Sequence, residues 1–165
     1  GKRTIFNMIG PLSSPAFVER QVVGVFDKKL LKIFADGLKS LNIKFAWIVH
    51  SDDGLDEISP YAKTNVVQLK NGKISNIEID PKKMNINAEN FNNILGGDKQ
   101  FNAKKIVDIF KGEDNDFSKA VCLNASAGLV VSENQKNIIE AYPITRKHIL
   151  SGNAYEHIKK LQSNE

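Results

Sequence analysis

Residues 21–50 read QVVGVFDKKLLKIFADGLKSLNIKFAWIVH, and this stretch decides the fold class. Its two ends, QVVGVF (21–26) and KFAWIVH (44–50), are short apolar runs rich in β-branched and aromatic residues, which is typical of buried strands. Between them, apolar residues recur at helical spacing, and Asp27 stands where it can cap the helix. A strand–helix–strand unit with so short a crossover predicts two parallel strands.

The pattern changes in the second half of the chain. Two alternating runs surround Asn71–Gly72, a pair that suits a two-residue hairpin turn because both residues tolerate positive φ. Further on, helices are expected at about 101–111, 117–131, 134–149 and 151–162, with Asp116 as the cap of the second. The predicted class is α/β: part of a mainly parallel sheet flanked by helices, with a β-hairpin and a helical C-terminal part.

Composition bounds the kind of protein. The 165 residues are 41% hydrophobic and 25% charged, which suits one domain with a real core. No apolar run reaches the roughly 18 residues of a membrane-spanning helix, and the N-terminus lacks the pattern of a signal peptide. The single cysteine, Cys122, has no partner for an internal disulfide and is expected to pack as a small hydrophobe. These features predict a cytoplasmic protein without membrane contact.

The charge balance is basic, with a formal net charge of +4. Lys and Arg are scattered along the chain in single positions and short pairs. Such a distribution favours an ordinary solvated surface over a nucleic-acid-binding one. No nucleic-acid partner is therefore predicted.

The stretch HSDDGLDEISP (50–60) collects four carboxylates within six positions, directly after the second predicted strand. We call residues 52–60 the acidic loop. Ligands of open α/β sheets bind beyond the carboxyl ends of the strands, which is where this loop would lie. Asp56 and Glu57 are adjacent hard oxygen donors that suit Mg²⁺. The alternative is a polar loop whose carboxylates cap a helix beginning near Leu55, and composition alone does not choose between the two.

His50, at the end of the same predicted strand, could touch a substrate or relay a proton. More often a lone histidine in such a place donates one hydrogen bond and does nothing else. No cysteine or second histidine stands near it in the sequence, which argues against a zinc site. The chain has no GxSxG, Walker loop or GxGxxG, and no residue is predicted to act as a covalent or acid–base catalyst.

The N-terminal stretch is punctuated by Gly10–Pro11, which brings backbone close to whatever lies opposite, or makes a simple turn before the first strand. With other stretches it resembles the anthranilate phosphoribosyltransferase family across essentially all 165 residues. The stretches that carry the resemblance are RTIFNMIGPLSSPA (3–16), GVF (24–26), HSDDGLDEIS (50–59), GG (96–97), NA (102–103), LNASAGL (123–129) and SGNAYEHIKKL (151–161).

The resemblance implies a transferase of tryptophan biosynthesis that moves a phosphoribosyl group from phosphoribosyl pyrophosphate to the amine of anthranilate. It implies that Asp56 and Glu57 bind Mg²⁺, because they match the family's DE pair. It also implies that Gly10 and Pro11 line the anthranilate site. Asn124, in LNASAGL, is expected to hydrogen-bond backbone.

Two positions depart from the family pattern: Ser14 replaces the usual asparagine, and Ser51 replaces the glycine usual after the histidine.

Two alternative functions share the architecture that the resemblance implies. One is a pyrimidine nucleoside phosphorylase, which uses phosphate, and the other is a non-catalytic relative that binds nucleic acid. The DGLDE sequence argues against both.

Members of the family are longer than this chain. Residues 1–165 are therefore expected to be the C-terminal portion of the phosphoribosyltransferase α/β domain. The N-terminal helical domain and the first half of the α/β domain, with its glycine-rich GTGGD loop, would precede them. The fragment is expected to be inactive alone, and the full-length protein is expected to be a homodimer.

Overall fold

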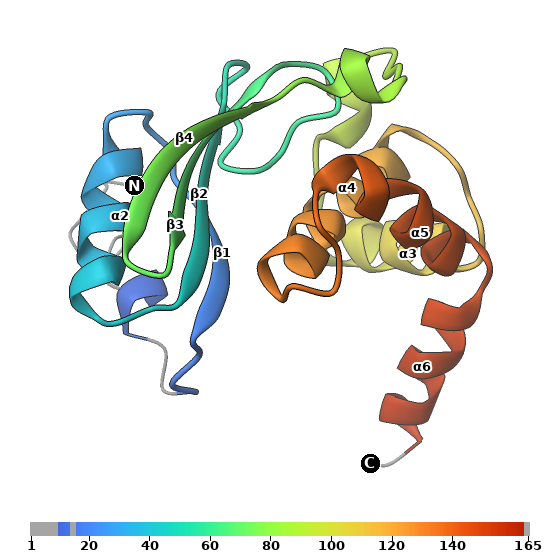
Figure 1. The fold of residues 1–165 in the computed structure, drawn as a ribbon. Helices are drawn as coiled ribbons and strands as arrows, with labels where there is room; N and C mark the ends of the chain where they lie inside the picture. The colour runs from blue at the N-terminus through green and yellow to red at the C-terminus, as the bar shows by residue number, and fades with distance from the viewer. Residues whose placement is uncertain (1–9, 14–15, 164–165) are drawn as a thin grey trace.

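The computed structural model describes residues 10–13 and 16–163 (Figure 1). One four-stranded sheet has the order β1-β2-β3-β4, with β1 (Arg20–Gly24), β2 (Phe45–Ser51), β3 (Thr64–Lys70) and β4 (Lys73–Ile79). The α-helices of this part of the chain are α2 (Leu30–Ser40), α3 (Lys99–Phe110), α4 (Asp116–Val131), α5 (Ile138–Leu150) and α6 (Asn153–Gln162). Short 3₁₀ helices are η1 (Gly10–Leu12), η2 (Pro81–Met84) and η3 (Phe91–Ile94).

The strand–helix–strand unit predicted from residues 21–50 is confirmed. β1 and β2 pair in parallel, with Arg20 opposite Phe45 and Gly24 opposite Val49. Helix α2 lies on one face of the sheet (Figure 1) and buries an apolar stripe against it. That stripe, Leu31, Phe34, Ala35 and Leu38, packs with Val23, Ala46, Ile48, Val67 and Leu69 of the sheet.

The expectation of a mainly parallel sheet is wrong, because the sheet is mixed. β2 pairs antiparallel with β3, with Ser51 opposite Thr64, and β3 pairs antiparallel with β4. A parallel neighbour would need a crossover, usually a helix, whereas residues 52–63 form only turns and bends that lead the chain straight back. The chain turns again at Asn71–Gly72, where both residues have positive φ (49° and 74°).

The other face of the sheet is covered by the helical part (Figure 1). Phe45, Trp47 and Val49 of β2 point to this side and pack with Leu123 and Ala127 of α4. β2 is therefore buried on both faces, which explains why its sequence is a continuous apolar run without alternation.

The C-terminal helices pack mainly on one another, around a small cluster of Ile109, Cys122 and Ile149. The prediction that Cys122 packs as a small hydrophobe is confirmed, since it is fully buried and unpaired. Helix α5 starts later than expected because Asn137 caps it by accepting a hydrogen bond from the Glu140 amide (2.9 Å). Within the described residues, no helix combines the length and the apolar character needed to cross a membrane.

Asp116 was expected to cap α4, and the structure gives that role to Asn115 instead. The Asn115 side chain accepts a hydrogen bond from the Ser118 amide, and Ser118 Oγ accepts one from the Asn115 amide, which completes a capping box. Asp116 is the first residue of the helix and is only 4% exposed. Its carboxylate does not cap the helix and has a different role.

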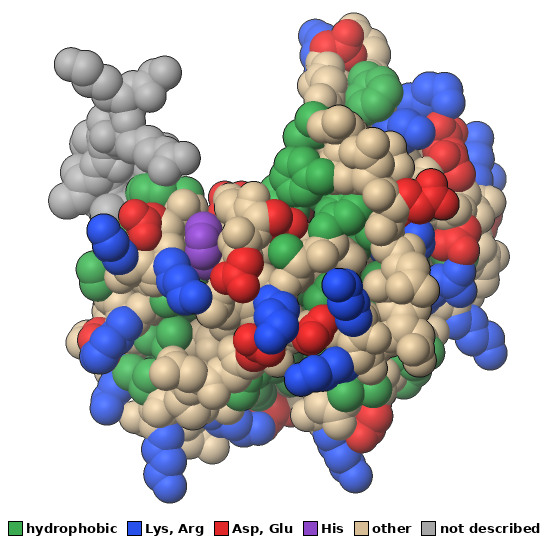
Figure 2. Space-filling view, turned by 90° about the horizontal axis from the view of Figure 1, so that it is seen from above, with side chains coloured by type: hydrophobic (Ala, Val, Ile, Leu, Met, Phe, Trp, Pro, Cys, Tyr) green, Lys and Arg blue, Asp and Glu red, His purple; other side chains and the backbone are tan. Residues whose placement is uncertain are grey.

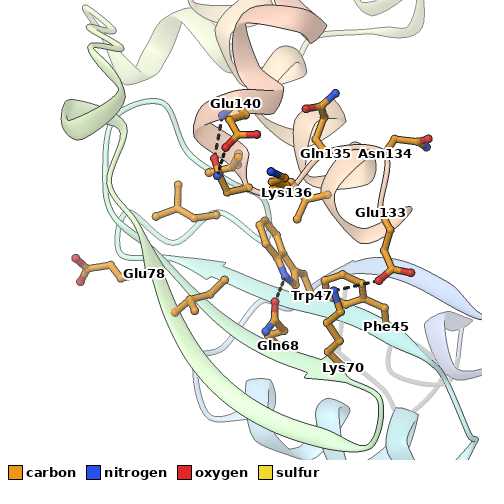
Figure 3. Close-up of a pocket in the computed structure, with 15 residues that line it drawn as sticks. Phe45, Trp47, Gln68, Lys70, Glu78, Glu133, Asn134, Gln135, Lys136 and Glu140 are labelled. Carbon is orange, nitrogen blue, oxygen red and sulfur yellow. Dashed lines mark hydrogen bonds and ion pairs between the residues drawn. The ribbon is translucent and has the colours of Figure 1, made fainter.

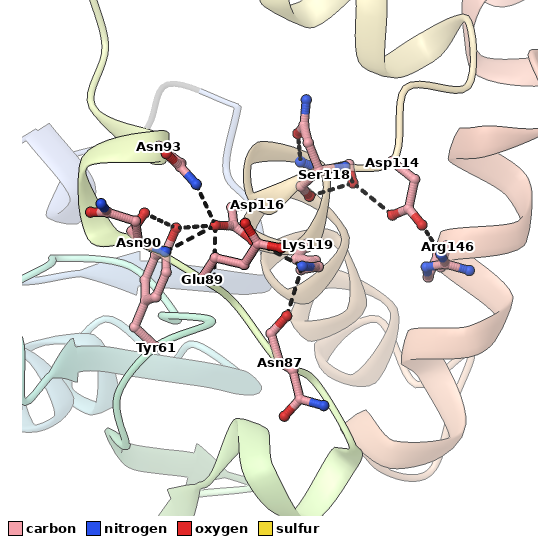
Figure 4. A network of polar contacts seen from close by, with 11 residues as sticks. Tyr61, Asn87, Glu89, Asn90, Asn93, Asp114, Asp116, Ser118, Lys119 and Arg146 are labelled. Carbon is pink, nitrogen blue, oxygen red and sulfur yellow. Dashed lines mark hydrogen bonds and ion pairs between the residues drawn. The ribbon is translucent and has the colours of Figure 1, made fainter.

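The Asp116 carboxylate joins the segment after β2 and the segment before α3 to helix α4 (Figure 4). The Asp116 carboxylate accepts hydrogen bonds from Tyr61 Oη (3.0 Å), the Glu89 amide (3.0 Å) and Asn93 Nδ2 (2.9 Å), and it pairs with Lys119 Nζ (2.8 Å). Burial by itself raises the pKa of Asp116, but the hydrogen bonds from Lys119, Asn93, Glu89 and Tyr61 together outweigh it and leave the pKa well below its ordinary value.

Replacing Asp116 with asparagine should lower the free energy of unfolding by about 2–3 kcal/mol, because an amide cannot satisfy so many buried donors. The folded-state pKa is depressed, so the carboxylate's contribution is complete above about pH 4 and lost as pH falls further. The gap between wild type and Asp116→Asn, measured by urea denaturation, should therefore narrow below about pH 4.

Asp36→Asn is the matched control, because Asp36 forms an exposed ion pair with Lys32 (2.7 Å). Its loss should cost less than about 1 kcal/mol. Equal losses in the two variants at pH 7 would contradict a structural role for the buried network.

Candidate functional site

The acidic loop leaves β2 at the end of the strand and contains no helix. The alternative in which its carboxylates cap a helix near Leu55 is therefore wrong. The first two carboxylates are used within the fold. Asp52 accepts a hydrogen bond from Asn65 Nδ2 (2.7 Å), and Asp53 accepts one from Ser59 Oγ (2.5 Å). These two residues hold the loop's own shape.

Asp56 and Glu57 differ from that first pair. Both are exposed, and among the described residues none donates a hydrogen bond or an ion pair to either carboxylate. Partial loss of solvent around the carboxyl group of Glu57, and then the neighbouring charge of Asp56, raise the pKa of Glu57 above its ordinary value. The pair thus concentrates negative charge that the described part of the protein does not neutralise.

The donor set suits Mg²⁺ better than zinc. Among the described residues, no three His, Cys, Asp or Glu side chains are grouped so that they could hold a metal ion by themselves. A zinc site needs three or four protein ligands, whereas Mg²⁺ is usually held by one or two carboxylates with water and substrate phosphates. Asp56 and Glu57 can supply that smaller number of hard oxygen ligands.

His50 is half-buried at the end of β2. Its Nδ1 lies 2.8 Å from the carbonyl oxygen of Val25, so Nδ1 carries the proton and donates it to that carbonyl. The contact ties the end of β2 to the residue that follows β1. This contact matches the simpler alternative for His50, in which the histidine donates one structural hydrogen bond.

Gly10 and Pro11 lie in η1, which contacts α2 through Leu12. Gly10 is exposed, and its carbonyl accepts a hydrogen bond from the Ser13 amide (3.2 Å). No hydrogen bond between described residues joins Gly10 or Pro11 to Asp56 or Glu57. The RTIFN motif and Ser14 lie outside the described residues.

A cleft of about 780 Å³ lies elsewhere, between β2–β4 and the segment that leads into α5 (Figure 3). Trp47 Nε1 donates to Gln68 Oε1 (3.0 Å) in this cleft, and Lys70 pairs with Glu133 (3.1 Å). None of the predicted site residues lines it. Its polar groups are partly satisfied by one another, and it is separate from the acidic loop.

Sequence reasoning missed most of what holds the acidic loop in place. The prediction that Asn124 hydrogen-bonds backbone is confirmed, and its partner is Ile58, two residues after Asp56. Ser51 was noted only as a departure from the family pattern, yet its buried hydroxyl donates to the carbonyl of Glu57 (2.6 Å). The signal that the sequence offered was a serine directly after the apolar strand, at a position where the family usually has glycine.

Comparison with known proteins identifies one family and relatives of one kind. A family model described as "Glycosyl transferase family, a/b domain" matches residues 1–155. The chain is 71% identical over 163 residues to the anthranilate phosphoribosyltransferase of Pelagibacter ubique (strain HTCC1062), covering 99% of this chain and 49% of that protein. It is 40% identical to the enzyme of Alkaliphilus metalliredigens (strain QYMF), covering 98% and 48%.

Solved structures of anthranilate phosphoribosyltransferases share the fold of this chain. The anthranilate phosphoribosyltransferase of Thermus thermophilus superposes with a TM-score of 0.85 at 29% identity, covering 97% of this chain and 47% of that one. The Saccharomyces cerevisiae enzyme in complex with PRPP and Mg has a TM-score of 0.80 at 23% identity, covering 96% and 46%, which shows the same fold.

The chain spans about half the length of the curated relatives it matches. The resemblance to the anthranilate phosphoribosyltransferases, drawn from short motifs, is confirmed by identity along nearly the whole chain. Because the α/β-domain model matches residues 1–155, the chain belongs to this glycosyl transferase family.

Proposed function

We propose that the protein containing residues 1–165 is an anthranilate phosphoribosyltransferase of tryptophan biosynthesis, acting in the cytoplasm. The observation that carries this proposal is the exposed Asp56–Glu57 pair, which has no protein partner among the described residues and follows a buried strand. The 71% identity to a curated enzyme of that activity supports it. In this proposal the chain is the C-terminal portion of the α/β domain, and the remainder supplies the helical domain and the rest of the substrate site.

The substrates follow from the same proposal. Phosphoribosyl pyrophosphate donates the phosphoribosyl group, and anthranilate accepts it. The yeast relative has been solved with PRPP and Mg and, separately, with 4-fluoroanthranilate. Gly10 and Pro11 would line the anthranilate site, where positioning matters because anthranilate is a weak nucleophile. The full-length protein is proposed to be a homodimer.

Asp56 and Glu57 would hold a Mg²⁺ ion, which neutralises charge on the leaving pyrophosphate when bound. The two carboxylates take no covalent part. The ribosyl carbon should develop oxocarbenium character as the bond to pyrophosphate breaks, as in glycoside cleavage. The chain's own contribution is therefore to present negative charge at a fixed place, so that the leaving group is stabilised as its charge grows.

The two alternatives are less well supported. The exposed Asp56–Glu57 pair argues against the pyrimidine nucleoside phosphorylase, which uses phosphate. On the face that Figure 2 shows, Lys and Arg side chains are interspersed with Asp and Glu. That arrangement does not favour a nucleic-acid-binding relative, which would need a continuous basic groove.

Replacing both Asp56 and Glu57 with alanine in the full-length protein should lower kcat on the order of 100-fold and abolish its normal dependence on Mg²⁺. The reason is that the charge on the leaving group is larger in the transition state than in the bound substrate, so losing the cation raises the barrier. Steady-state kinetics across a Mg²⁺ titration is the measurement. Asp36→Ala is the control, because Asp36 is an exposed carboxylate on α2 outside the acidic loop, and this variant should retain the Mg²⁺ dependence. A double variant with wild-type kcat and Mg²⁺ dependence would refute the metal-binding role.

Glu57→Gln tests how much the charge of Glu57 costs the stability of the fold. The pKa of Glu57 is raised in the folded state, so the ionised carboxylate disfavours folding once pH rises through that value. The variant should match or exceed wild type in free energy of unfolding at pH 7, by about 0.5 kcal/mol or less. The difference should vanish below about pH 4. Urea denaturation at the two pH values tests this, and a variant clearly less stable at pH 7 would contradict it.

A further inference from the structure

Three consecutive residues of the acidic loop have their backbone fixed by three different elements. The carbonyl of Asp56 lies against β1, the carbonyl of Glu57 is bound from β2, and both backbone groups of Ile58 are bound from α4. The residues that make these contacts are Gly24, Ser51 and Asn124.

Gly24 makes room for the loop. A Cβ atom built on Gly24 would lie 1.7 Å from the carbonyl oxygen of Asp56, far inside any possible contact. The backbone of the acidic loop therefore rests directly on the end of β1. Gly24 is required for this close approach, because its φ is not among the positive values that would otherwise explain a glycine.

Ser51 holds the next residue through a buried chain of hydroxyls. Its Oγ–H donates to the carbonyl of Glu57 (2.6 Å), and Oγ accepts from the Ser59 amide (3.2 Å). Thr64 Oγ1 lies 2.6 Å from Ser51 Oγ. Since the Ser51 proton is already used, the Thr64 hydroxyl must be the donor in that contact. Ser51 and Thr64 are both fully buried, so this arrangement has no competing water.

Asn124 binds the third residue in both directions. Its Oδ1 accepts from the Ile58 amide (2.9 Å), and its Nδ2 donates to the Ile58 carbonyl (3.1 Å) and to the Ala120 carbonyl (3.0 Å). The side chain thus pairs with Ile58 as a neighbouring strand would. The bond to Ala120 fixes the side chain on α4, so the loop's position follows that helix.

We infer that Gly24, Ser51 and Asn124 are positioning residues that place the Asp56 and Glu57 carboxylates for a divalent cation. This inference rests on the proposed function. The two side chains repel each other and have no partner among the described residues, so no described side chain holds the carboxylates in place. Their position must come from the backbone, and a backbone fixed in advance spares the cost of ordering it on binding.

The test measures metal binding and backbone mobility in the full-length protein, without using activity. Affinity for Mn²⁺ in the presence of pyrophosphate is obtained from the electron paramagnetic resonance signal of free Mn²⁺. Mobility is obtained from hydrogen–deuterium exchange of the peptide that contains Ile58. Asn124→Ala should weaken Mn²⁺ binding about 10-fold or more, the range typical of residues that support metal ligands, and should accelerate exchange in that peptide.

Ser126→Ala is the matched control for this variant. Ser126 is also fully buried on α4, but its hydroxyl contacts the Cys122 carbonyl (2.5 Å) and Thr145 (3.1 Å) on α5 rather than the loop. It should alter stability while leaving Mn²⁺ affinity and exchange at Ile58 unchanged.

A second pair of variants keeps the test decisive if Asn124→Ala fails to fold. Gly24→Ala forces the Asp56 carbonyl to move and should weaken Mn²⁺ binding, whereas Gly128→Ala on α4 meets no atom within 4 Å and should not. Wild-type Mn²⁺ affinity in both Asn124→Ala and Gly24→Ala, or equal losses in the two controls, would overturn the inference. Failure of the wild type to bind Mn²⁺ with pyrophosphate would instead overturn the proposed function, and the inference with it.

Discussion

The burial of β2 on both faces is the constraint on which the rest of the structure depends. Helix α2 covers one side of this strand and α4 covers the other, so its residues 45–49 lie in two cores at once. A strand held in this way cannot shift in register without exposing apolar side chains on both sides. The loop that follows it therefore starts from a fixed point. β1 and β3 flank the same strand, and both contribute contacts to that loop.

The carboxylates of the acidic loop differ in whether the fold supplies hydrogen-bond donors to them. Asp52 and Asp53 are satisfied by neighbouring donors and shape the loop, while Asp56 and Glu57 are left with their charge. The buried Asp116 shows the opposite solution, in which one carboxylate binds five donors and becomes part of the core. Negative charge is stabilising where the protein supplies donors, and available for a ligand where it does not.

Much of this fold could be predicted from local pattern, and the failures have physical causes. The apolar runs and the helical spacing of residues 21–50 determine the parallel pair, because both signals lie within one short segment. The direction of β3 could not be predicted in that way, since alternation along Thr64–Lys70 is the same for either direction of pairing. The adjacency of Asp56 and Glu57 indicated a metal-binding pair, but their anchors at Gly24, Ser51 and Asn124 depend on contacts between distant segments. Asp116 was misassigned because a helix cap is a local feature, whereas the partners of its carboxylate other than Lys119 are 23 to 55 residues away in the sequence.

The bond between Asn124 and Ile58 also has a consequence for the order of events during synthesis. The two residues are separated by 66 positions, so the acidic loop leaves the ribosome well before the residue that clamps it. Until α4 has been made and has docked, the backbone of Ile58 lacks that partner, and closing so long a loop carries an entropic cost. The strand–helix–strand unit can assemble from local contacts alone. The loop that bears the free carboxylates should therefore be among the last parts of the chain to acquire its final geometry, and unlike that unit it depends on translation reaching the C-terminal helices.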